Sequence, residues 1–564
     1  MANDRRNPMF SESTALNGVH GGMSADALPR GYISQGLNLQ VRGGNLKTRP
    51  RYKSLGTFTT AGEFRGAYTY SLASGDTIVF GVDDTIYEFN PLDGTTATVA
   101  TFSTNTGPFY FVQADRYLVV QNGTDLPYFY ERGGAISRFS TGVEEIPAGT
   151  HMAYAHGRIY LVPRTLADGT SGAPYWIAGD ILLPLNPSNV LKLTENEYWN
   201  EGGATGLPFE AGTITALAVM QNAQTGTGLG ALLAFGRSGV SAHQVDASRE
   251  DWKSLDFSQV LFTGDGATGQ FTVTPVNSDV MFRSAAGIQS IRLSSASDRG
   301  WSVRPISYEI EHRLEKDPTD QLKTAYSAFA NNEYVLTSAG YGENGWNGVV
   351  VLDTLVSSMM TQANPPAYND LWVSCPVQSV NRCRVDGKPQ VVTIFRRGNG
   401  LTFAYPSNDL TKDFDATPVK TRVYTRAYKY DDLMSLQFVD VIFRNIESTE
   451  LIPRVYYRTD FYPRWTPCGG PDVIQNRIRS HIRFPAEIDG CLENGLSPRT
   501  GNSVQFCIEW TGVAEIEKWS AQINPEITDP AQLLSCTQAG SALSPSLDLA
   551  MVTLDDVGDT LCTL

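Results

Sequence analysis

Histidines and carboxylates are the first side chains to weigh, because sets of them hold metals or move protons in enzymes. The 564-residue sequence contains six histidines. His151 and His156 lie five residues apart in a strand-and-turn context, which is not the i, i+4 helical spacing of a zinc-binding H-E-x-x-H motif. Polar packing at the edge of a sheet is the favoured interpretation, and a metal site is the alternative. We therefore expect no metal and no cofactor.

Glycoside cleavage would require two carboxyl groups, one to protonate the leaving group and one to attack or to activate water. Adjacent residues of a strand point to opposite faces, so neighbouring acids do not form a ready acid–base pair. The sequence has no G-x-S-x-G and no P-loop, and SASDRGWS at 295–302 lacks the residue order of a sialidase Asp-box. We expect turn acids, no catalytic residues and no enzyme activity. The candidate acids were Asp83-Asp84, Glu144-Glu145, Glu195 with Glu197, and Asp431-Asp432.

An aromatic segment at 176–203 has two interpretations. Trp176, Tyr198 and Trp199 are mixed there with acids and asparagines. Such rings stack on sugars, or they fill contacts between protomers. We favour a protomer contact, because large β-rich assemblies bury such loops.

A basic cluster near the N-terminus is the second candidate contact. Arg42, Lys47, Arg49 and Arg51 fall within ten residues. These cations repel one another unless acids face them, and the acids come either from the chain's own body or from a partner. If a partner supplies them, Arg49→Glu impairs assembly and leaves the monomer stable. If the body supplies them, the same change lowers the stability of the monomer.

Short strands joined by turns must position these residues. From about residue 66, runs of β-branched and aromatic residues alternate at period two and are separated by Gly, Asn and Asp turns. The runs at 67–70, 109–112 and 151–154 start 42 residues apart, which is the length of one four-stranded propeller blade. Later runs start at 216, 271, 325 and 391, at wider spacings that indicate loop insertions. The pattern predicts an all-β chain with an irregular β-propeller of six or seven blades, rather than a sandwich or a solenoid.

The chain divides into four expected parts. Residues 1–53 form an N-terminal arm and the first strands, with residues 1–22 flexible or ordered only by a partner. Residues 54–411 form the propeller, and the long alternation that begins near 421 predicts a β-sandwich-like platform domain over 412–523. Residues 524–564 are acidic and interrupted by Pro, Ser and Gly, which predicts an extended C-terminal arm or a disordered tail.

Charge and cysteine content exclude several classes of protein. The net charge is −15, and because residues 1–53 carry +5, the remainder carries −20. An acidic body disfavours tight binding of nucleic acid or of an anionic membrane surface. We expect no membrane span, because no run of about 18 apolar residues occurs. Seven cysteines clustered between Cys375 and Cys562 indicate reduced thiols made in a cytoplasm rather than a disulfide framework.

Two stretches of the chain resemble a known family. The run N-L-Q-V-R-G-G-N-L-K-T-R-P at 38–50 resembles the opening of podovirus tail nozzle proteins, the tail tubular protein B family, although Arg51 replaces the usual glycine after the proline. TRAYKYDD at 425–432 and the strands after it resemble the segment that follows the propeller in those proteins. The matching residues are Asn38, Arg42, Gly43, Gly44, Leu46, Arg49, Pro50 and Tyr52 in the first stretch, and Thr425, Ala427, Tyr428, Asp431, Val439, Tyr457 and Asp460 in the second.

The resemblance implies a structural virion protein, made in the host cytoplasm and located in the tail. It implies a homohexameric nozzle beneath a tail adaptor ring, with tail fibres or a tail needle as further partners. Viral DNA would pass through without specific binding, along a path that we expect to be negative or neutral. The alternative is a β-propeller protein that binds or cleaves glycans, and a generic propeller scaffold is a third possibility.

Overall fold

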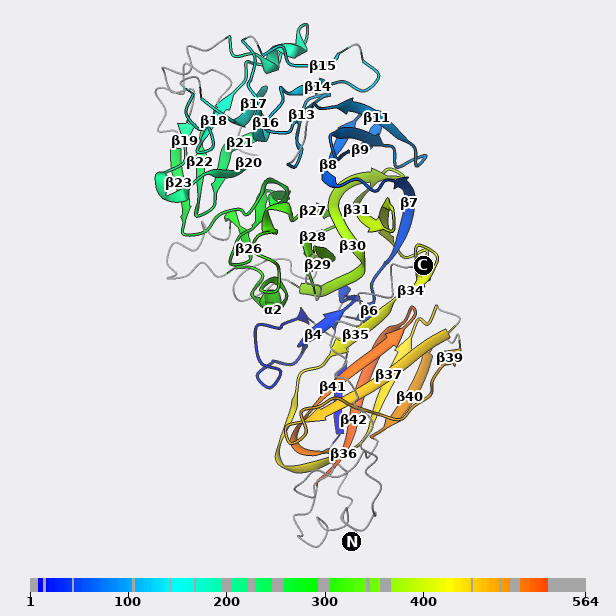
Figure 1. Ribbon diagram of the computed structural model, residues 1–564. Helices are drawn as coiled ribbons and strands as arrows, with labels where there is room; N and C mark the ends of the chain where they lie inside the picture. Colours follow the sequence, from blue (N-terminus) through cyan, green and yellow to red (C-terminus); the bar gives the residue numbers. More distant parts are fainter. Residues whose placement is uncertain are drawn as a thin grey trace, which may run out of the picture.

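The structure is a computed structural model in which β-strands dominate (Figure 1). It describes residues 9–13, 17–42, 45–103, 107–134, 136–142, 144–166, 169–194, 205–221, 229–245, 258–292, 305–340, 345–355, 367–447, 450–475, 479–486 and 498–525. Gly43, Gly44, Glu195, Glu197, Tyr198, Trp199, the 295–302 segment and the arm beyond 525 lie outside these residues.

Five separate antiparallel sheets follow one another along the chain and form the first five blades of a propeller (Figure 1). The strands are β8 (Phe64–Leu72), β9 (Gly75–Val82), β10 (Thr85–Phe89) and β11 (Thr96–Thr101); β12 (Tyr110–Ala114), β13 (Tyr117–Gln121), β14 (Tyr128–Tyr130) and β15 (Ser137–Phe139); β16 (Gly149–Ala155), β17 (Arg158–Pro163), β18 (Tyr175–Ala178) and β19 (Thr205–Gly206); β20 (Ile214–Gln221), β21 (Leu229–Gly236), β22 (Gly239–His243) and β23 (Ser258–Thr263); β24 (Thr274–Val276), β25 (Asp279–Arg283) and β26 (Ile288–Ser290).

Part of one continuous sheet, which also includes the platform strands, supplies the last two blades. The strands of this part are β27 (Ser327–Ala330), β28 (Glu333–Ser338), β29 (Trp346–Asp353), β30 (Ala367–Val385), β31 (Lys388–Arg397), β32 (Gly400–Ser407) and β7 (Arg51–Thr59). The first half of β30 pairs with β29 and its second half with β31, so one strand belongs to both blades. The N-terminal strand β7 pairs with β32 and completes the last blade. Seven blades result among the described residues.

The hairpin turns have the positive φ that their turn residues predict. Asp83, Asp115, His156 and Asp386 have positive φ in two-residue turns between consecutive strands. Asp, Asn and His tolerate this backbone conformation better than most residues. Short helices connect other strands: η2 (Pro187–Leu191), η3 (Phe209–Ala211), η5 (Gln270–Thr272), η6 (Tyr308–Ile310), α2 (Glu311–Leu314) and η7 (Leu322–Thr324).

The spacing argument is correct for most blades and wrong for the last. The runs at 67, 109, 151 and 216 fall at the first strands of the first four blades, and 325 lies just before β27. The run at 271 falls on η5, directly before β24. The run at 391 falls on β31, the second strand of its blade, because the long β30 already provides the first strand.

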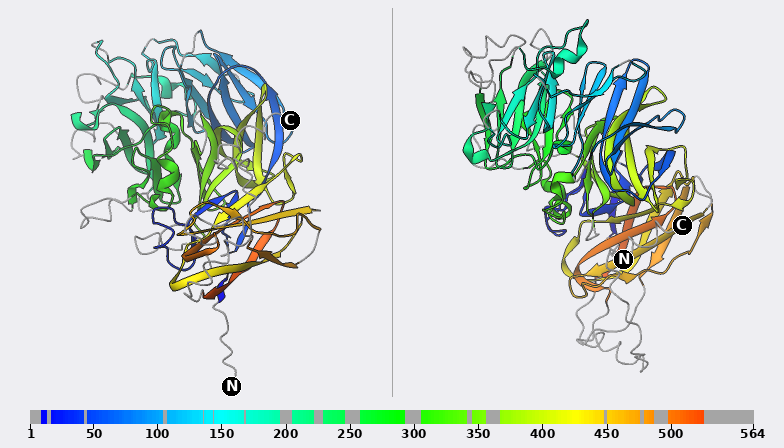
Figure 2. Two further views of the ribbon diagram at one scale, coloured as in Figure 1. Left: turned by 60° about the horizontal axis from the view of Figure 1, so that its bottom comes forward. Right: turned by 45° about the horizontal axis from the view of Figure 1, so that its top comes forward.

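The platform is a β-sandwich-like domain, as expected, and lies beneath the propeller in both further views (Figure 2). One layer contains β40, β36, β42 and β1, and the other contains β37, β41, β35 and β4. Their bounds are β1 (Met9–Ser13), β4 (Gln35–Leu37), β35 (Lys420–Tyr424), β36 (Tyr428–Arg444), β37 (Glu450–Thr459), β40 (Arg479–Pro485), β41 (Thr500–Thr511) and β42 (Glu515–Pro525). Short pairs flank them: β33 (Lys412–Asp413) with β34 (Thr417–Pro418), and β38 (Thr466–Pro467) and β39 (Ile474–Gln475) on β37.

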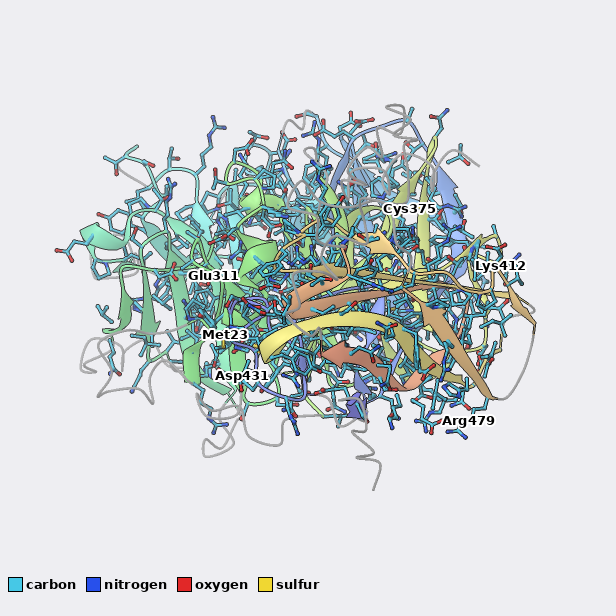
Figure 3. All side chains as sticks on the ribbon, turned by 90° about the horizontal axis from the view of Figure 1, so that it is seen from below. Met23, Glu311, Cys375, Lys412, Asp431 and Arg479 are labelled. Carbon is cyan, nitrogen blue, oxygen red and sulfur yellow. The ribbon has the colours of Figure 1, made fainter. Side chains whose placement is uncertain are left out.

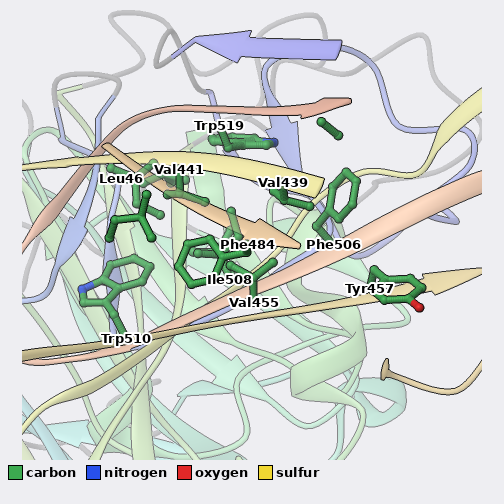
Figure 4. Packing of buried hydrophobic residues seen from close by; sticks show 14 of the residues in the cluster. Leu46, Val439, Val441, Val455, Tyr457, Phe484, Phe506, Ile508, Trp510 and Trp519 are labelled. Atoms are coloured by element: carbon green, nitrogen blue, oxygen red, sulfur yellow. The ribbon is translucent and has the colours of Figure 1, made fainter. Parts of the chain in front are cut away.

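Side chains from the two layers form one apolar core (Figure 4). Val439 and Val441 come from β36, and Trp519 comes from β42. Phe506 and Ile508 of β41 enter the core from the other layer. Alternate residues of each strand point inward, which is the pattern from which the domain was predicted.

The N-terminal region does not form a separate arm in its described part. β1 pairs with β42, and β2 (Gly18–Val19) pairs with β3 (Tyr32–Ile33). Next, β5 (Leu39–Gln40) pairs with β6 (Leu46–Thr48), and β6 also pairs with β42. The chain therefore runs through the platform before β7 enters the propeller, and the expected flexible arm over 1–22 is wrong for residues 9–13 and 17–22.

Candidate functional site: the junction segment

Residues 35–42 and 45–52, here called the junction segment, lie between the propeller and the platform (Figure 1). The hydroxyl of Thr48 accepts a hydrogen bond from Trp510 Nε1 at 2.9 Å and donates to the carbonyl of Gly512 at 3.0 Å. These contacts attach the segment to the platform. On the other side, Trp372 Nε1 of the propeller donates to the carbonyl of Leu39 at 2.7 Å.

Arg49 is the centre of the junction. Its side chain is 1% exposed, and its Nη1 lies 2.9 Å from Oδ1 of Asp413 in the linker after the propeller. Nε donates to Asn38 Oδ1 and Nη2 donates to the carbonyl of Val373, each at 2.9 Å. Burial disfavours the charged guanidinium, but Asp413 outweighs it and the pKa of Arg49 is raised. One side chain thus connects the junction segment, the propeller and the linker.

Arg51 is buried by the same linker. Its Nη2 donates to the carbonyl of Asn408 at 2.7 Å, and Glu447 of the platform lies 3.8 Å from it. Burial lowers the pKa of Arg51, and Glu447 partly opposes this effect. Backbone carbonyls accept most of the hydrogen bonds that this guanidinium donates, as expected for buried donors.

Arg42 reaches the sixth blade. Its Nε donates to Asp353 Oδ2 at 2.7 Å, and its Nη2 lies 3.5 Å from Glu333 Oε1. Gln40 also donates to Glu333, at 3.1 Å. Burial raises the pKa of Glu333 to about 7, although Arg42 lowers it and Asp353 raises it further. Arg42 is 30% exposed, so this contact is at the rim of the junction.

A second buried pair was not predicted from the sequence. Arg313 of α2 donates to Asp370 of β30 through Nε at 2.7 Å, and Asp370 also accepts from the backbone N–H of Gly36 at 2.7 Å. Asp370 is fully buried; burial alone would raise its pKa, but Arg313 and His312 hold the pKa well below its usual range. No local motif marks this site, because its members are far apart in the sequence.

For three residues of the basic cluster, the structure shows whether the facing acids belong to the chain itself or could come from a partner. Arg42, Arg49 and Arg51 have acids of the chain's own body as partners. Arg49 and Arg51 are therefore not available to a neighbour, because both side chains are at most 3% exposed. Lys47 lies on β6 opposite Glu515 of β42 and is partly exposed.

The aromatic segment is also placed differently from the expectation. Trp176 on β18 is fully buried, with its ring edge-on to Tyr160 at 5.5 Å and to His243 at 5.4 Å. It is a core residue between two blades and not a protomer contact. The interpretation of Tyr198 and Trp199 lies outside the described residues.

The acids and histidines have structural roles where the structure describes them. The Asp83 carboxylate accepts the backbone N–H of Glu63 at the β9–β10 turn, and Glu145 pairs with Arg138 at 2.9 Å. Asp431 is exposed on β36, and the side chain of its neighbour lies outside the description. Burial lowers the pKa of His151 to about 4, and His156 occupies a hairpin turn. Within the described ranges no group of three metal-binding side chains gathers.

Aromatic rings close the middle of the propeller. Tyr110 of the second blade stacks on Phe271 of η5, which precedes the fifth blade, with ring centres 6.2 Å apart. Phe271 stacks in turn on Tyr326 at 4.5 Å, and Tyr326 contacts Phe64 of the first blade at 6.3 Å. Rings from blades that are not neighbours meet only across the axis. The blades of a propeller surround a central channel, and these four rings lie across it here.

A surface pocket of about 230 Å³ lies beside β9 and β10. Glu88 in its wall accepts hydrogen bonds from Thr77 at 2.6 Å, from Arg132 at 2.5 Å and from Tyr130 at 2.7 Å. Both oxygens of Glu88 therefore accept hydrogen bonds from the chain itself, and Arg132 pairs with its charge. Leu92 at the rim is exposed.

Comparison with known proteins extends only to the fold. No family model matches the chain, and no curated protein matches it. Similar solved structures include BBS1N in complex with ARL6DN, at 11% identity over 64% of this chain and 99% of that chain, with a TM-score of 0.38. The mitotic checkpoint complex shows 11% identity over 63% of this chain and 96% of that chain, with a TM-score of 0.39. The Cps50 (Swd1) beta-propeller domain from Myceliophteria thermophila shows 11% identity over 63% and 99%, with a TM-score of 0.37. Among the described residues, no helix has the length and apolar character to cross a membrane.

Proposed function

We propose that the chain is a structural protomer of a short-tailed phage tail nozzle and that it acts as a homohexamer in the lower DNA-ejection conduit. The observation that carries the proposal is the junction segment. Two of the residues that resemble the nozzle opening contact Asp413: Arg49 through its guanidinium and Tyr52 through its backbone N–H. A third, Asn38, accepts a hydrogen bond from Arg49. The two contact faces of a protomer in a closed ring must keep a fixed orientation, and the junction segment supplies contacts to both the propeller and the platform.

The filled propeller axis supports the same proposal. Because Phe271 and Tyr326 close the axis, DNA would pass along the axis of the ring, between protomers, and not through an individual propeller. With a chain charge of −15, the wall of such a path is net negative or neutral, so DNA would slide without specific binding. The partners of the proposed nozzle are the adaptor ring above and fibres or a needle, and its location is the virion tail.

The experiment is mass measurement of the purified full-length chain by native mass spectrometry and light scattering. The proposal expects a closed ring of six copies of the 61.6 kDa chain. A chain that remains monomeric at all concentrations and salt conditions, and that forms no ring with a tail adaptor, would contradict it. The alternative is a glycan-binding or glycan-cleaving propeller, and turnover of a glycan panel or retention on it would establish that function.

A further inference from the structure

The outer strand of the first blade, β11, has an open edge at the periphery of the propeller (Figure 1). Among the described residues β11 pairs with β10 alone, so the backbone groups on its other edge have no strand partner. β11 spans six residues, whereas β15 and β19, the outer strands of the next two blades, span three and two. Its sequence, TATVAT, contains neither a charged residue nor a proline, which commonly prevent strand addition.

A bulge limits the regular part of this edge. The register between β10 and β11 shifts at Val99, which has no partner residue on β10. The carbonyl of Val99 accepts a hydrogen bond from the hydroxyl of Tyr128 in the second blade. A regular edge therefore remains over residues 95–98, which is long enough for another extended chain to pair with it.

The surface pocket of about 230 Å³ lies beside this part of the edge. Thr95, directly before β11, and Ala97 both line the pocket, and Ala97 pairs with Glu88 of β10. A strand added to β11 places every second side chain on the same face as Ala97. Because Thr95 and Ala97 are small, one side chain of the added strand can pass over them into the pocket. Leu92, 64% exposed, offers apolar contact to the stem of that side chain.

The pocket wall contains one acid whose charge is not matched. Arg132 pairs with Glu88 at 2.5 Å, so these two charges compensate each other. Asp76 accepts the backbone N–H of Arg384 through Oδ2 at 2.7 Å, but its Oδ1 has no hydrogen-bond partner among the described residues. Asp76 is only 7% exposed, and a buried carboxylate oxygen without a donor is unfavourable. The pocket thus offers a negative charge that still lacks a donor.

A lysine or arginine side chain fits this pocket best. Such a side chain supplies both the N–H donors and the positive charge that Asp76 lacks. A carboxylate would bring a like charge against Asp76, and the exposed Asp93 beside the pocket would oppose it as well. An apolar side chain would leave the Asp76 oxygen without a donor. Sugars are disfavoured, since none of the described residues that line the pocket is aromatic.

We propose that β11 and the pocket beside it form a peptide-binding site. An extended segment of another protein pairs with the edge of β11 and places one Lys or Arg side chain in the pocket against Asp76. Backbone hydrogen bonds to β11 provide affinity, and the pocket selects the cationic side chain. This inference does not depend on the proposed ring.

The test measures binding of a fluorescein-labelled peptide, TVTKTVT, to the full-length protein by fluorescence anisotropy. A second probe, TVTETVT, reverses the central charge. Two further probes carry backbone N-methyl groups on the odd or on the even residues of TVTKTVT, and each removes the donors of one edge of the peptide. On the protein side, Asp76→Asn removes the unmatched charge, and Asp93→Asn removes one charge from an exposed position outside the pocket wall. Thermal unfolding checks that both variants are folded.

The expected result is saturable binding of TVTKTVT that is at least tenfold weaker for TVTETVT, for one of the two N-methylated probes and for Asp76→Asn, and that changes less than about twofold for Asp93→Asn. No saturable binding up to about 1 mM peptide would overturn the inference, as would unchanged binding of both N-methylated probes or of Asp76→Asn. Self-association of the chain that TVTKTVT displaces would make a second copy the occupant and would also overturn it.

Discussion

Two groups of arginines in this chain stand in opposite surroundings. Arg49 in the junction segment is 1% exposed and bound on every side by the chain itself. Arg479, at the periphery of the platform (Figure 3), is 60% exposed and pairs with Glu517, which is 32% exposed. A buried, fully paired cation holds the fold, whereas an exposed ion pair contributes little to stability. The predictions below test that difference.

The largest effect is expected at the partner of Arg49. Asp413→Ala leaves a buried guanidinium without its carboxylate, and breaking such a pair lowers the free energy of unfolding by about 3–5 kcal/mol. Urea unfolding measures the loss. Asp409→Ala, at an exposed position of the same linker, is the control and should change stability by less than about 0.5 kcal/mol. Equal losses of stability in the two variants would show that the pair of Arg49 with Asp413 does not stabilise the fold more than an exposed residue of the linker does.

Glu333 makes the stability of the fold depend on pH. Burial raises its pKa to about 7 from the ordinary value of 4.5, so the folded state keeps a proton that the unfolded state releases. Its contribution to stability is complete below pH 4.5 and is lost as the pH rises toward 7, at about 1.4 kcal/mol for each unit. Arg42, Asp353, Gln40 and Lys47 are the groups that act on it.

Glu333→Gln should remove this component. The free energy of unfolding, measured between pH 4.5 and 8, should fall less steeply with pH in the variant than in the wild type. Parallel curves for the two proteins would contradict the assignment of the proton to Glu333.

A smaller loss is expected at the rim of the junction. Arg42→Ala leaves the fully buried carboxylate of Asp353 without its cation, which should lower the free energy of unfolding by about 1–3 kcal/mol. Lys47→Ala, in the same segment but without an ion pair among the described residues, should change it by less than about 0.5 kcal/mol. If Lys47→Ala lowered the free energy of unfolding more than Arg42→Ala in denaturant titrations, the contacts of Arg42 would not account for the stability of this segment.

The smallest effect on stability is expected for Arg479 on β40. Arg479→Ala removes an ion pair with Glu517 in which the two side chains are 60% and 32% exposed, and such pairs contribute about 0–1 kcal/mol. The melting temperature should therefore change little. A loss as large as that of Asp413→Ala would show that exposure does not separate the two arginines.

Local chemistry made the strands and turns predictable. Asp115 and His156 stand where two-residue turns require positive φ, and the alternation around them marks the strands on either side. The 42-residue spacing located the first three blades correctly because those blades have short loops. It failed at β30, where one strand serves two blades, because nothing in the local pattern distinguishes a shared strand from two separate ones.

Long-range partners could not be predicted. Arg49 and Asp413 are 364 residues apart, and β7 completes a blade whose other strands lie beyond residue 366. The aromatic content of its segment predicts a contact for Trp176, but burial depends on the packing of the next blade, which the segment does not encode. The sequence also cannot decide whether the acids that face the basic cluster belong to the chain itself or to a partner, because only the fold brings Asp413 to Arg49.

Chemical unfolding of Arg49→Glu beside Arg479→Glu tests the central claim most directly, because both variants make the same change of charge on the same residue type. We predict that Arg49→Glu, which brings a second carboxylate against Asp413, loses several kcal/mol of stability, of the order of 3–5 kcal/mol, while Arg479→Glu stays within about 1 kcal/mol of the wild type. Equal unfolding midpoints for the two variants would contradict the account.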